Sequence, residues 1–226
     1  NTFQQNTHNT GLSTEDITTA YIEAIAQVFQ QIYQFNKSHL NRQHANRQHA
    51  KVTQQPLSKL DFRVVIDCMH GATSSIAQRL FGYFCQEVIM INDIADGNFP
   101  SGNPDPTEPH RLTQLQQNVI HHQADIGIAF DGDGDRLMIV DTNGKVVSPD
   151  HLLYLLAQVA IAERPDTLYD AESISSQHSP QVLFDIKCSH HLPKLLSELD
   201  ATPVMSRTGS SFMRQQIQHS DYQIVF

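Results

Sequence analysis

Three aspartates and an arginine stand close together in the middle of the chain and could bind a divalent cation. Three carboxylates this close repel one another unless a cation lies between them. Their oxygens are hard ligands, which favour Mg²⁺, Ca²⁺ or Mn²⁺ over Zn²⁺. The intervening glycines lack a Cβ, so the backbone can bend tightly and aim alternate Asp side chains at one point. The run is Asp131-Gly132-Asp133-Gly134-Asp135-Arg136.

Two other kinds of loop share features with this run. Asp-Gly pairs often form solvated hairpin turns that bind nothing. Three Asp at alternate positions between the apolar segments 126–130 and 137–140 instead favour a ligand-binding loop. An EF-hand loop needs Gly at its sixth position and Glu at its twelfth, and here those positions hold Arg136 and Thr142. The sequence therefore predicts a metal loop of another kind between two buried strands.

The composition describes an acidic, globular chain. It has 226 residues, of which 39% are hydrophobic and 17% charged, and its formal net charge is −9. This length suits one large domain or two modest ones. Lys and Arg are not concentrated in any stretch, so neither nucleic acid nor an anionic membrane is expected as a partner. The longest apolar run, Leu152 to Ala162, is too short to span a bilayer.

The cysteines and histidines indicate no zinc site or disulfide framework. Cys68, Cys85 and Cys188 lack CxxC spacing, which fits the reducing cytoplasm. The pairs His121-His122 and His190-His191 lack metal-ligand spacing on a helix face and are interpreted as surface residues.

The N-terminal part of the chain is expected to contribute one helix. Residues 1–14 are polar and are expected to be poorly ordered. From residue 15 to about residue 35, apolar side chains recur at a helical period. Residues 36–59 contain the pentapeptide Asn-Arg-Gln-His-Ala twice in tandem. Two copies are too few for a solenoid, so this segment is interpreted as a polar insertion without chemistry.

From residue 60 onward, segments typical of strands and helices alternate. Strands are expected at 62–67, 87–91, 126–130, 137–141, 146–147, 182–186, 202–205 and 222–226, and helices at 71–84, 111–122, 149–163, 189–199 and 210–218. Repeated β-α-β units predict an α/β fold with largely parallel sheets. The turn Asn143-Gly144 predicts a hairpin that makes the first sheet mixed. We expect two consecutive three-layer α/β domains, 15–145 and 146–226, the second of them truncated because it ends on an apolar strand.

Taken together, the motifs resemble those of the α-D-phosphohexomutases, especially the bacterial phosphomannomutase/phosphoglucomutase branch. The segment 64–71 is similar to the opening strand and turn of the family's second domain, and 96–106 to its DGNFP…PDP loop. The run 129–136 is similar to the family's metal loop. The segments 184–188 and 207–209 are similar to parts of its third domain. The resemblance covers roughly residues 60–226.

The resemblance implies a reaction and a set of site residues. Such enzymes move a phosphoryl group between O1 and O6 of a hexose, through a phosphoserine and a bisphosphorylated sugar. The implied cofactor is Mg²⁺, held by Asp131, Asp133 and Asp135 and by the phosphoserine. Arg136 and Lys187 are implied as catalytic and phosphate-binding residues. Gly209 and Ser210 are implied as substrate-binding, together with Arg136 and Lys187.

The sequence departs from the family pattern in several places. Ser210 stands where that branch has a histidine, and a hydroxyl cannot serve as a cationic donor or a proton shuttle near neutral pH. The family's Ser-His-Asn-Pro motif does not occur in these residues, and Ser74-Ser75 lies in a different context. We therefore expect these residues to be the second domain and most of the third, with the first and fourth domains lacking.

Several hypotheses stay open at the level of sequence. The first is the central part of a mutase, inactive alone, whose ligands are mannose or glucose phosphates and a hexose bisphosphate. The second is a stand-alone, non-enzymatic metal-binding module. A phosphoglucosamine mutase-type relative is the third. Because the phosphoserine ligand is lacking, Mg²⁺ binding is expected to be weak, with a Kd in the range of roughly 10⁻³ M.

Overall fold

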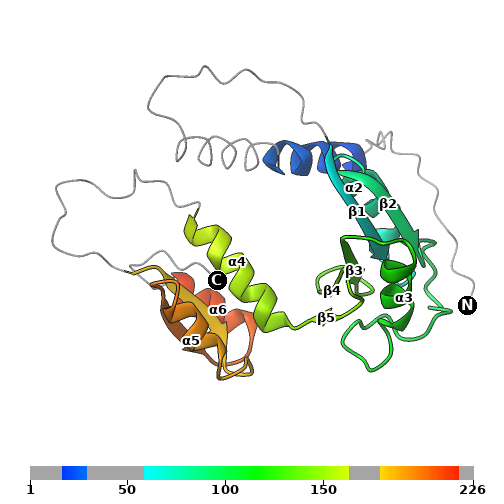
Figure 1. Ribbon diagram of the computed structural model, residues 1–226. Helices are drawn as coiled ribbons and strands as arrows, with labels where there is room; N and C mark the ends of the chain where they lie inside the picture. Colours follow the sequence, from blue (N-terminus) through cyan, green and yellow to red (C-terminus); the bar gives the residue numbers. More distant parts are fainter. Residues whose placement is uncertain (1–16, 30–58, 163–178, 219–226) are drawn as a thin grey trace, which may run out of the picture.

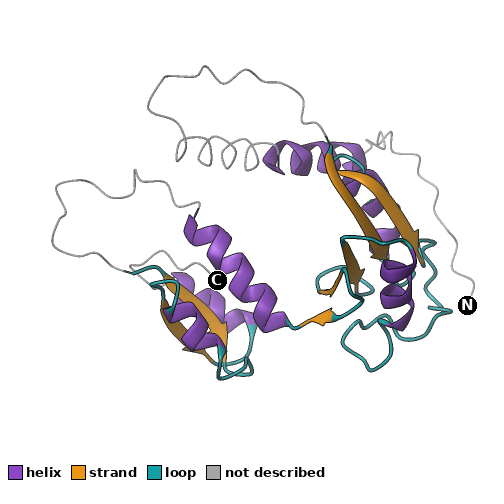
Figure 2. Cartoon of the chain, viewed as in Figure 1, coloured by secondary structure: helices purple, strands orange, loops and turns teal. Residues whose placement is uncertain are grey.

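The computed structural model describes residues 17–29, 59–162 and 179–218. The polar N-terminal stretch, the tandem pentapeptides, most of the loop 165–180 and the expected strand 222–226 lie outside the described residues. Within the described part, the predicted α/β class is confirmed (Figures 1 and 2). Strands and helices alternate along the chain as the sequence predicts.

The first part of the described chain is built around a mixed sheet with the strand order β2-β1-β3-β4-β5. β1 pairs in parallel with both β2 and β3, whereas the β3–β4 and β4–β5 pairs are antiparallel. The predicted hairpin at Asn143-Gly144 joins β4 to β5. The strands are β1 (Leu60–Asp67), β2 (Cys85–Ile91), β3 (Ile126–Phe130), β4 (Leu137–Asp141) and β5 (Val146–Val147).

Both faces of this sheet are buried, which gives three layers (Figure 2). Val65 belongs to a cluster with Leu115 and Val119 of helix α3 (Thr113–His121). Its neighbours Val64 and Ile66 point to the other face, where they pack with α2 (Ala77–Phe81) and with the helical residues 17–29. Consecutive side chains of a strand point to opposite faces, so an uninterrupted apolar β1 is what a sheet covered on both sides requires.

One predicted element is wrong in its form. The helix expected over 71–84 is a 3₁₀ turn, η1 (Ala72–Ser75), followed by the short helix α2. Gly71 is extended, and the Ala72 N–H donates to the Gly132 carbonyl at 2.9 Å rather than within a helix. At the other end of the expected helix, Phe84 is buried. Its carbonyl accepts a hydrogen bond from the Leu60 N–H at 2.7 Å. Contacts with distant segments therefore shorten the helix at both ends.

In the second part, residues 149–162 and 179–218 form two parallel strands and three helices. They are α4 (Pro149–Ala162), β6 (Gln181–Asp185), α5 (Leu192–Ser197), β7 (Thr202–Ser206) and α6 (Ser210–Gln218). Their core joins Ala157 of α4, Val182 and Phe184 of β6, and Leu192 and Leu196 of α5. Pro149 begins α4, where its fixed φ suits a helix start. The sequence predicted α6 with these same bounds.

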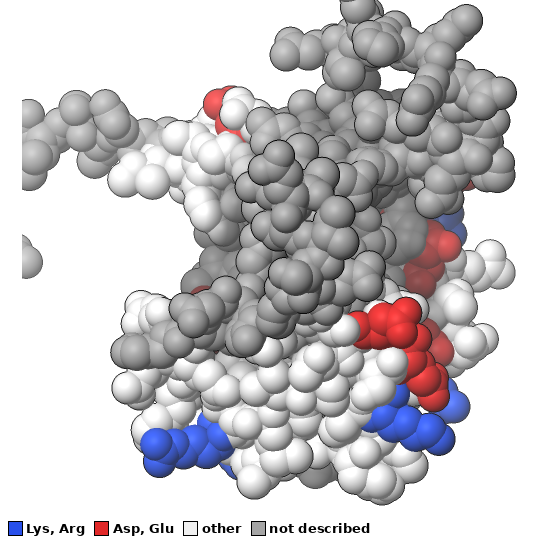
Figure 3. Space-filling model, turned by 90° about the vertical axis from the view of Figure 1, so that its left-hand side faces the viewer, with Lys and Arg blue, Asp and Glu red and all other residues white. Residues whose placement is uncertain are grey.

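The surface and the helix lengths add two observations. On the face in Figure 3, the basic side chains of described residues stand in separate groups, and the group at the lower right lies beside acidic side chains. Among the described helices, none combines the length and the apolar character needed to cross a membrane.

Candidate functional site

Three loops meet at the carboxyl ends of the parallel strands β1, β2 and β3. They are the turn 68–76, the loop 92–106 and the predicted metal loop 131–136. Gly132 joins all three, because its carbonyl accepts from Ala72 and its N–H donates to the Pro104 carbonyl at 3.1 Å. The Asp96 N–H donates to the His70 carbonyl at 3.0 Å. Ligand sites of open α/β sheets lie at this edge of the sheet.

The structure brings the three predicted metal ligands together. One carboxylate oxygen each from Asp131, Asp133 and Asp135 lies within 4.8 Å of the others. Asp131 is 1% exposed, whereas Asp133 and Asp135 are open to solvent. Three hard oxygen donors on one side and open space on the other fit a divalent cation that keeps some of its waters, which is how Mg²⁺ is usually bound.

The backbone of the loop is folded around Asp131. Its Oδ1 accepts hydrogen bonds from the N–H groups of Gly134 at 3.0 Å and Arg136 at 3.1 Å. Gly134 has φ +82°, and a Cβ there would lie 2.7 Å from Cγ2 of Thr73. Glycine is therefore required at this position both by the left-handed backbone and by the close approach of the turn 68–76.

The electrostatics of the loop reflect three carboxylates crowded beside a single arginine, Arg136. The charge of Asp133, partial burial and the charge of Asp131 raise the pKa of Asp135 above its usual value. Burial also raises the pKa of Asp131, but hydrogen bonds from Arg136 outweigh it and bring that pKa below the usual value. A divalent cation at this point would relieve the repulsion that acts on Asp135.

Arg136 closes the loop and lies near three carboxylates, since its Nε is also 3.6 Å from Oδ1 of Asp135. Its Nε donates to Oδ2 of Asp131 at 2.7 Å, and an NH1 hydrogen bond of 3.2 Å reaches Oδ2 of Asp105. Hydrogen bonds with Asp105 and Asp131 raise the pKa of the Arg136 guanidinium. Hydrogen bonds from Thr107, with a further contribution from Arg136, lower the pKa of Asp105 to about 2. The sequence singled out Arg136, but gave no role to Asp105.

Sequence reasoning also missed a hydrogen-bonded chain beside the metal loop. Buried Asp67 accepts from Nδ2 of Asn92 at 2.9 Å, and Oδ1 of Asn92 accepts from Ser101 Oγ at 3.1 Å. The Ser101 hydroxyl in turn lies 2.9 Å from Nε2 of His70. These residues tie the ends of β1 and β2 to the loop 92–106. Polar residues directly after the buried β1 and β2 were the signal that could have indicated it.

The remaining predicted site residues lie in the second part of the chain. Lys187 is exposed after β6, and Gly209 and Ser210 stand where α6 begins. Asp185 connects these two places, since its Oδ1 accepts from the Lys187 N–H and from Thr208 Oγ1, both at 2.8 Å. Among the described residues, no ion pair joins this group to the aspartates of the metal loop.

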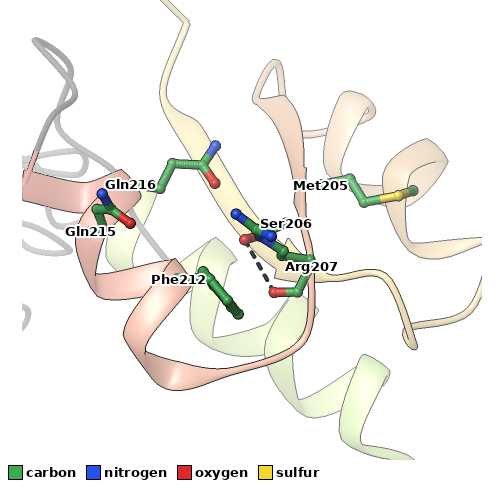
Figure 4. A pocket seen from close by; sticks show the side chains of 6 residues that line it. All are labelled: Met205, Ser206, Arg207, Phe212, Gln215 and Gln216. Atoms are coloured by element: carbon green, nitrogen blue, oxygen red, sulfur yellow. Dashed lines mark hydrogen bonds between the residues drawn. The ribbon is translucent and has the colours of Figure 1, made fainter.

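A hollow of about 390 Å³ lies next to this group, between the end of β7 and α6 (Figure 4). The Arg207 guanidinium lies 3.8 Å above the ring of Phe212, a cation–π contact. Gln215 and Gln216 line the same hollow together with Met205 and Ser206. None of the predicted site residues lines it, so the hollow and the candidate metal site are separate features of the described chain.

Comparison with known proteins agrees with the motifs. A family profile described as phosphoglucomutase/phosphomannomutase, alpha/beta/alpha domain II, matches residues 42–144. A phosphomannomutase/phosphoglucomutase of Pseudomonas syringae pv. tomato is 38% identical over 158 residues, which are 70% of this chain and 31% of that protein. A phosphoglucosamine mutase of Hydrogenovibrio crunogenus is 46% identical over 108 residues, 47% of this chain and 24% of the relative.

A solved structure shows the same fold. It is a phosphoglucomutase/phosphomannomutase family protein of Burkholderia thailandensis, with a TM-score of 0.62 and 30% identity, covering 73% of this chain and 34% of that one. The chain spans about a third of the length of the curated relatives it matches. The matched profile covers the metal loop and strands β1 to β4 of the sheet that carries it. Residues 42–144 therefore match the α/β/α domain II of the phosphoglucomutase/phosphomannomutase family, and the similarity to its members extends over 70% of the chain.

Proposed function

We propose that this chain supplies the metal-binding part of a phosphohexomutase active site. The reaction is the interconversion of hexose 1-phosphate and hexose 6-phosphate through a phosphoserine and a bisphosphorylated sugar. The cofactor is Mg²⁺, and the ligands are glucose or mannose phosphates and a hexose bisphosphate. The free thiols Cys68, Cys85 and Cys188 fit a cytoplasmic enzyme.

The observation that carries this proposal is the arrangement of Asp131, Asp133 and Asp135. Three carboxylate oxygens within 4.8 Å, at the carboxyl ends of the parallel strands β1, β2 and β3, form a donor set that suits Mg²⁺. The raised pKa of Asp135 supports it, because the charges of Asp133 and Asp131 outweigh the opposing effect of Arg136. When bound, Mg²⁺ would offset the negative charge that phosphoryl oxygens carry during transfer.

The other proposed residues act on the phosphate and the sugar. Arg136 presents a planar guanidinium at the rim of the metal loop, which suits binding of a phosphate by two parallel hydrogen bonds. Lys187 contributes a second cation, which can hold a phosphate or move a proton. Gly209 and Ser210 bind the sugar, and Ser210 does so as a neutral hydrogen-bonding group.

Two alternatives are kept because particular observations favour them. The 46% identity to a phosphoglucosamine mutase supports glucosamine phosphates as the substrate class. The exposed position of Asp133 and Asp135 also suits a non-enzymatic module that binds a metal without a sugar. The phosphoglucosamine mutase alternative changes only the sugar phosphate that is bound. The non-enzymatic alternative means that no reaction is catalysed.

Binding of sugar phosphates distinguishes these functions. Glucose 1-phosphate, mannose 1-phosphate and glucosamine 1-phosphate are titrated into the chain with and without Mg²⁺. The proposal predicts that the chain binds a sugar phosphate and that Mg²⁺ strengthens this binding. The sugar phosphate that binds most tightly identifies the branch of the family. Binding of Mg²⁺ without any effect of the sugar phosphates would favour the non-enzymatic module. The 226 residues alone should not convert glucose 1-phosphate, because they lack the Ser-His-Asn-Pro motif.

A further inference from the structure

The guanidinium of Arg136 bridges two segments that are far apart in the sequence. Its Nε donates to Asp131 in the metal loop, and its NH1 donates to Asp105 in the segment that follows β2. The two acidic partners differ in exposure, since the Asp131 side chain is 2% exposed and that of Asp105 is 26% exposed. The Arg136 Nε also lies 3.6 Å from Oδ1 of Asp135, so Asp105 is the partner of Arg136 that lies outside the candidate metal site.

Asp105 is oriented before it meets Arg136. Its Oδ1 accepts hydrogen bonds from the Thr107 N–H at 2.9 Å and from Thr107 Oγ1 at 2.7 Å. This leaves Oδ2 of Asp105 for the guanidinium. The segment is also fixed to the metal loop, because the Pro104 carbonyl accepts from the Gly132 N–H. A carboxylate held in this way can keep its position when its partner moves.

The Nε of Arg136 competes with a cation for the same carboxylate. Oδ1 of Asp131 already accepts two backbone N–H groups, so Oδ2 is the oxygen with more free capacity. That oxygen is the one bound to Arg136 Nε at 2.7 Å. A divalent cation on Asp131 and a guanidinium beside it repel each other. Cation binding must therefore weaken the bond between Arg136 and Asp131, while the bond to Asp105 is spared.

We propose that Asp105 is the positioning residue for Arg136. When a divalent cation binds Asp131, Asp105 holds the guanidinium at the rim of the loop. The arginine then stays available to bind an anionic ligand. Without Asp105, the guanidinium would have only Asp131 and Asp135 of the metal loop as partners and would compete more strongly with the cation. The inference rests on the proposed function, because it requires the loop to bind Mg²⁺.

The test is a double-mutant cycle read by Mg²⁺ affinity. Isothermal titration calorimetry at 0.15 M salt, about the physiological ionic strength, compares the unchanged chain with Asp105→Asn, Arg136→Gln and the double variant. Asp105→Asn should weaken Mg²⁺ binding by about two- to fivefold, the scale of an exposed ion pair. In the Arg136→Gln background the same change should have almost no effect, because the competing guanidinium is gone.

Two further variants separate positioning from charge. Thr107→Val keeps the charge of Asp105 but removes the hydrogen bond from Thr107 Oγ1, so it should weaken Mg²⁺ binding less than Asp105→Asn does. Asp61→Asn removes an exposed charge at the amino end of β1, away from the site, and should leave Mg²⁺ affinity unchanged. Thermal melts without Mg²⁺ confirm that each variant is folded.

The outcomes are distinguishable. If Asp105→Asn weakens Mg²⁺ binding equally in both backgrounds, Asp105 acts through its charge alone and the positioning role is overturned. An unchanged affinity in Asp105→Asn overturns it as well. If the unchanged chain binds no Mg²⁺, or if Asp133→Asn binds it equally well, the proposed metal site fails and this inference fails with it.

Discussion

The backbones of Gly71 and Gly132 lie so close together that a Cβ on Gly71 would stand 2.5 Å from the Gly132 carbonyl oxygen. The first residue follows β1 and the second belongs to the metal loop after β3. A hydrogen bond of 2.9 Å from the Ala72 N–H to the Gly132 carbonyl also joins the two segments. The position of the metal loop therefore depends on a glycine outside it.

Gly71→Ala should destabilise the chain and disturb the loop. The backbone at Gly71 has φ −89° and ψ −168°, which alanine adopts freely, so the whole cost is steric. We expect a loss of about 1–3 kcal/mol in the free energy of unfolding, the usual range for overpacking. Urea denaturation measures it. Gly97→Ala is the matched control, because a Cβ there meets nothing within 4 Å, and equal losses in both variants would contradict the account.

Asp67 should make stability depend on pH. Burial raises the pKa of Asp67 in the folded chain, although Asn92 and Met69 hydrogen-bond to it. A folded-state pKa above the unfolded value means that this group favours folding at low pH, and that the contribution is lost as pH rises through the raised folded value. Asp67→Asn keeps an acceptor for the Met69 N–H and carries no charge.

Asp67→Asn should therefore gain stability relative to the unchanged chain as pH rises from about 4 to about 7. Urea denaturation across this range measures the difference between the two proteins. A constant difference would show that Asp67 has the same pKa in the folded and unfolded chains. A difference that moves the other way would show that the hydrogen bonds outweigh burial.

Lys187→Met should weaken sugar phosphate binding while leaving Mg²⁺ affinity unchanged. The lysine lies in the second part of the chain, and its backbone is fixed by Asp185 through a 2.8 Å hydrogen bond. A lost charge-assisted hydrogen bond to phosphate corresponds to roughly a tenfold loss of affinity. Titration of glucose 1-phosphate in the presence of Mg²⁺ measures it, with Lys194→Met on α5 as the control. Equal effects of the two variants on sugar phosphate affinity would show that Lys187 is not part of the binding site.

Local patterns predicted the sheet and the convergence of the three aspartates because their determinants lie close together in the sequence. Val64, Val65 and Ile66 are all apolar, which is typical of a strand covered on both faces. The alternation of Asp and Gly predicted the convergence of Asp131, Asp133 and Asp135. These features follow from neighbouring residues and from the two-residue period of a strand.

Contacts between distant segments could not be predicted in this way. The shortened helix after β1 depends on the bond between Ala72 and Gly132, which belong to different loops. The pairing of Asp105 with Arg136 joins residues 31 positions apart. The sequence contains both charges, but only the sheet order β2-β1-β3 places their loops at one edge.

The most direct test of the central claim is calorimetric titration of Mg²⁺ into the chain and into Asp133→Asn. Asp133 is exposed and lies in the cluster of three carboxylates, so the substitution removes a ligand without emptying the core. The account predicts weak binding, with a Kd of roughly 10⁻³ M for a site with few fixed ligands, and its loss in Asp133→Asn. Mg²⁺ binding of equal strength in both proteins would contradict it.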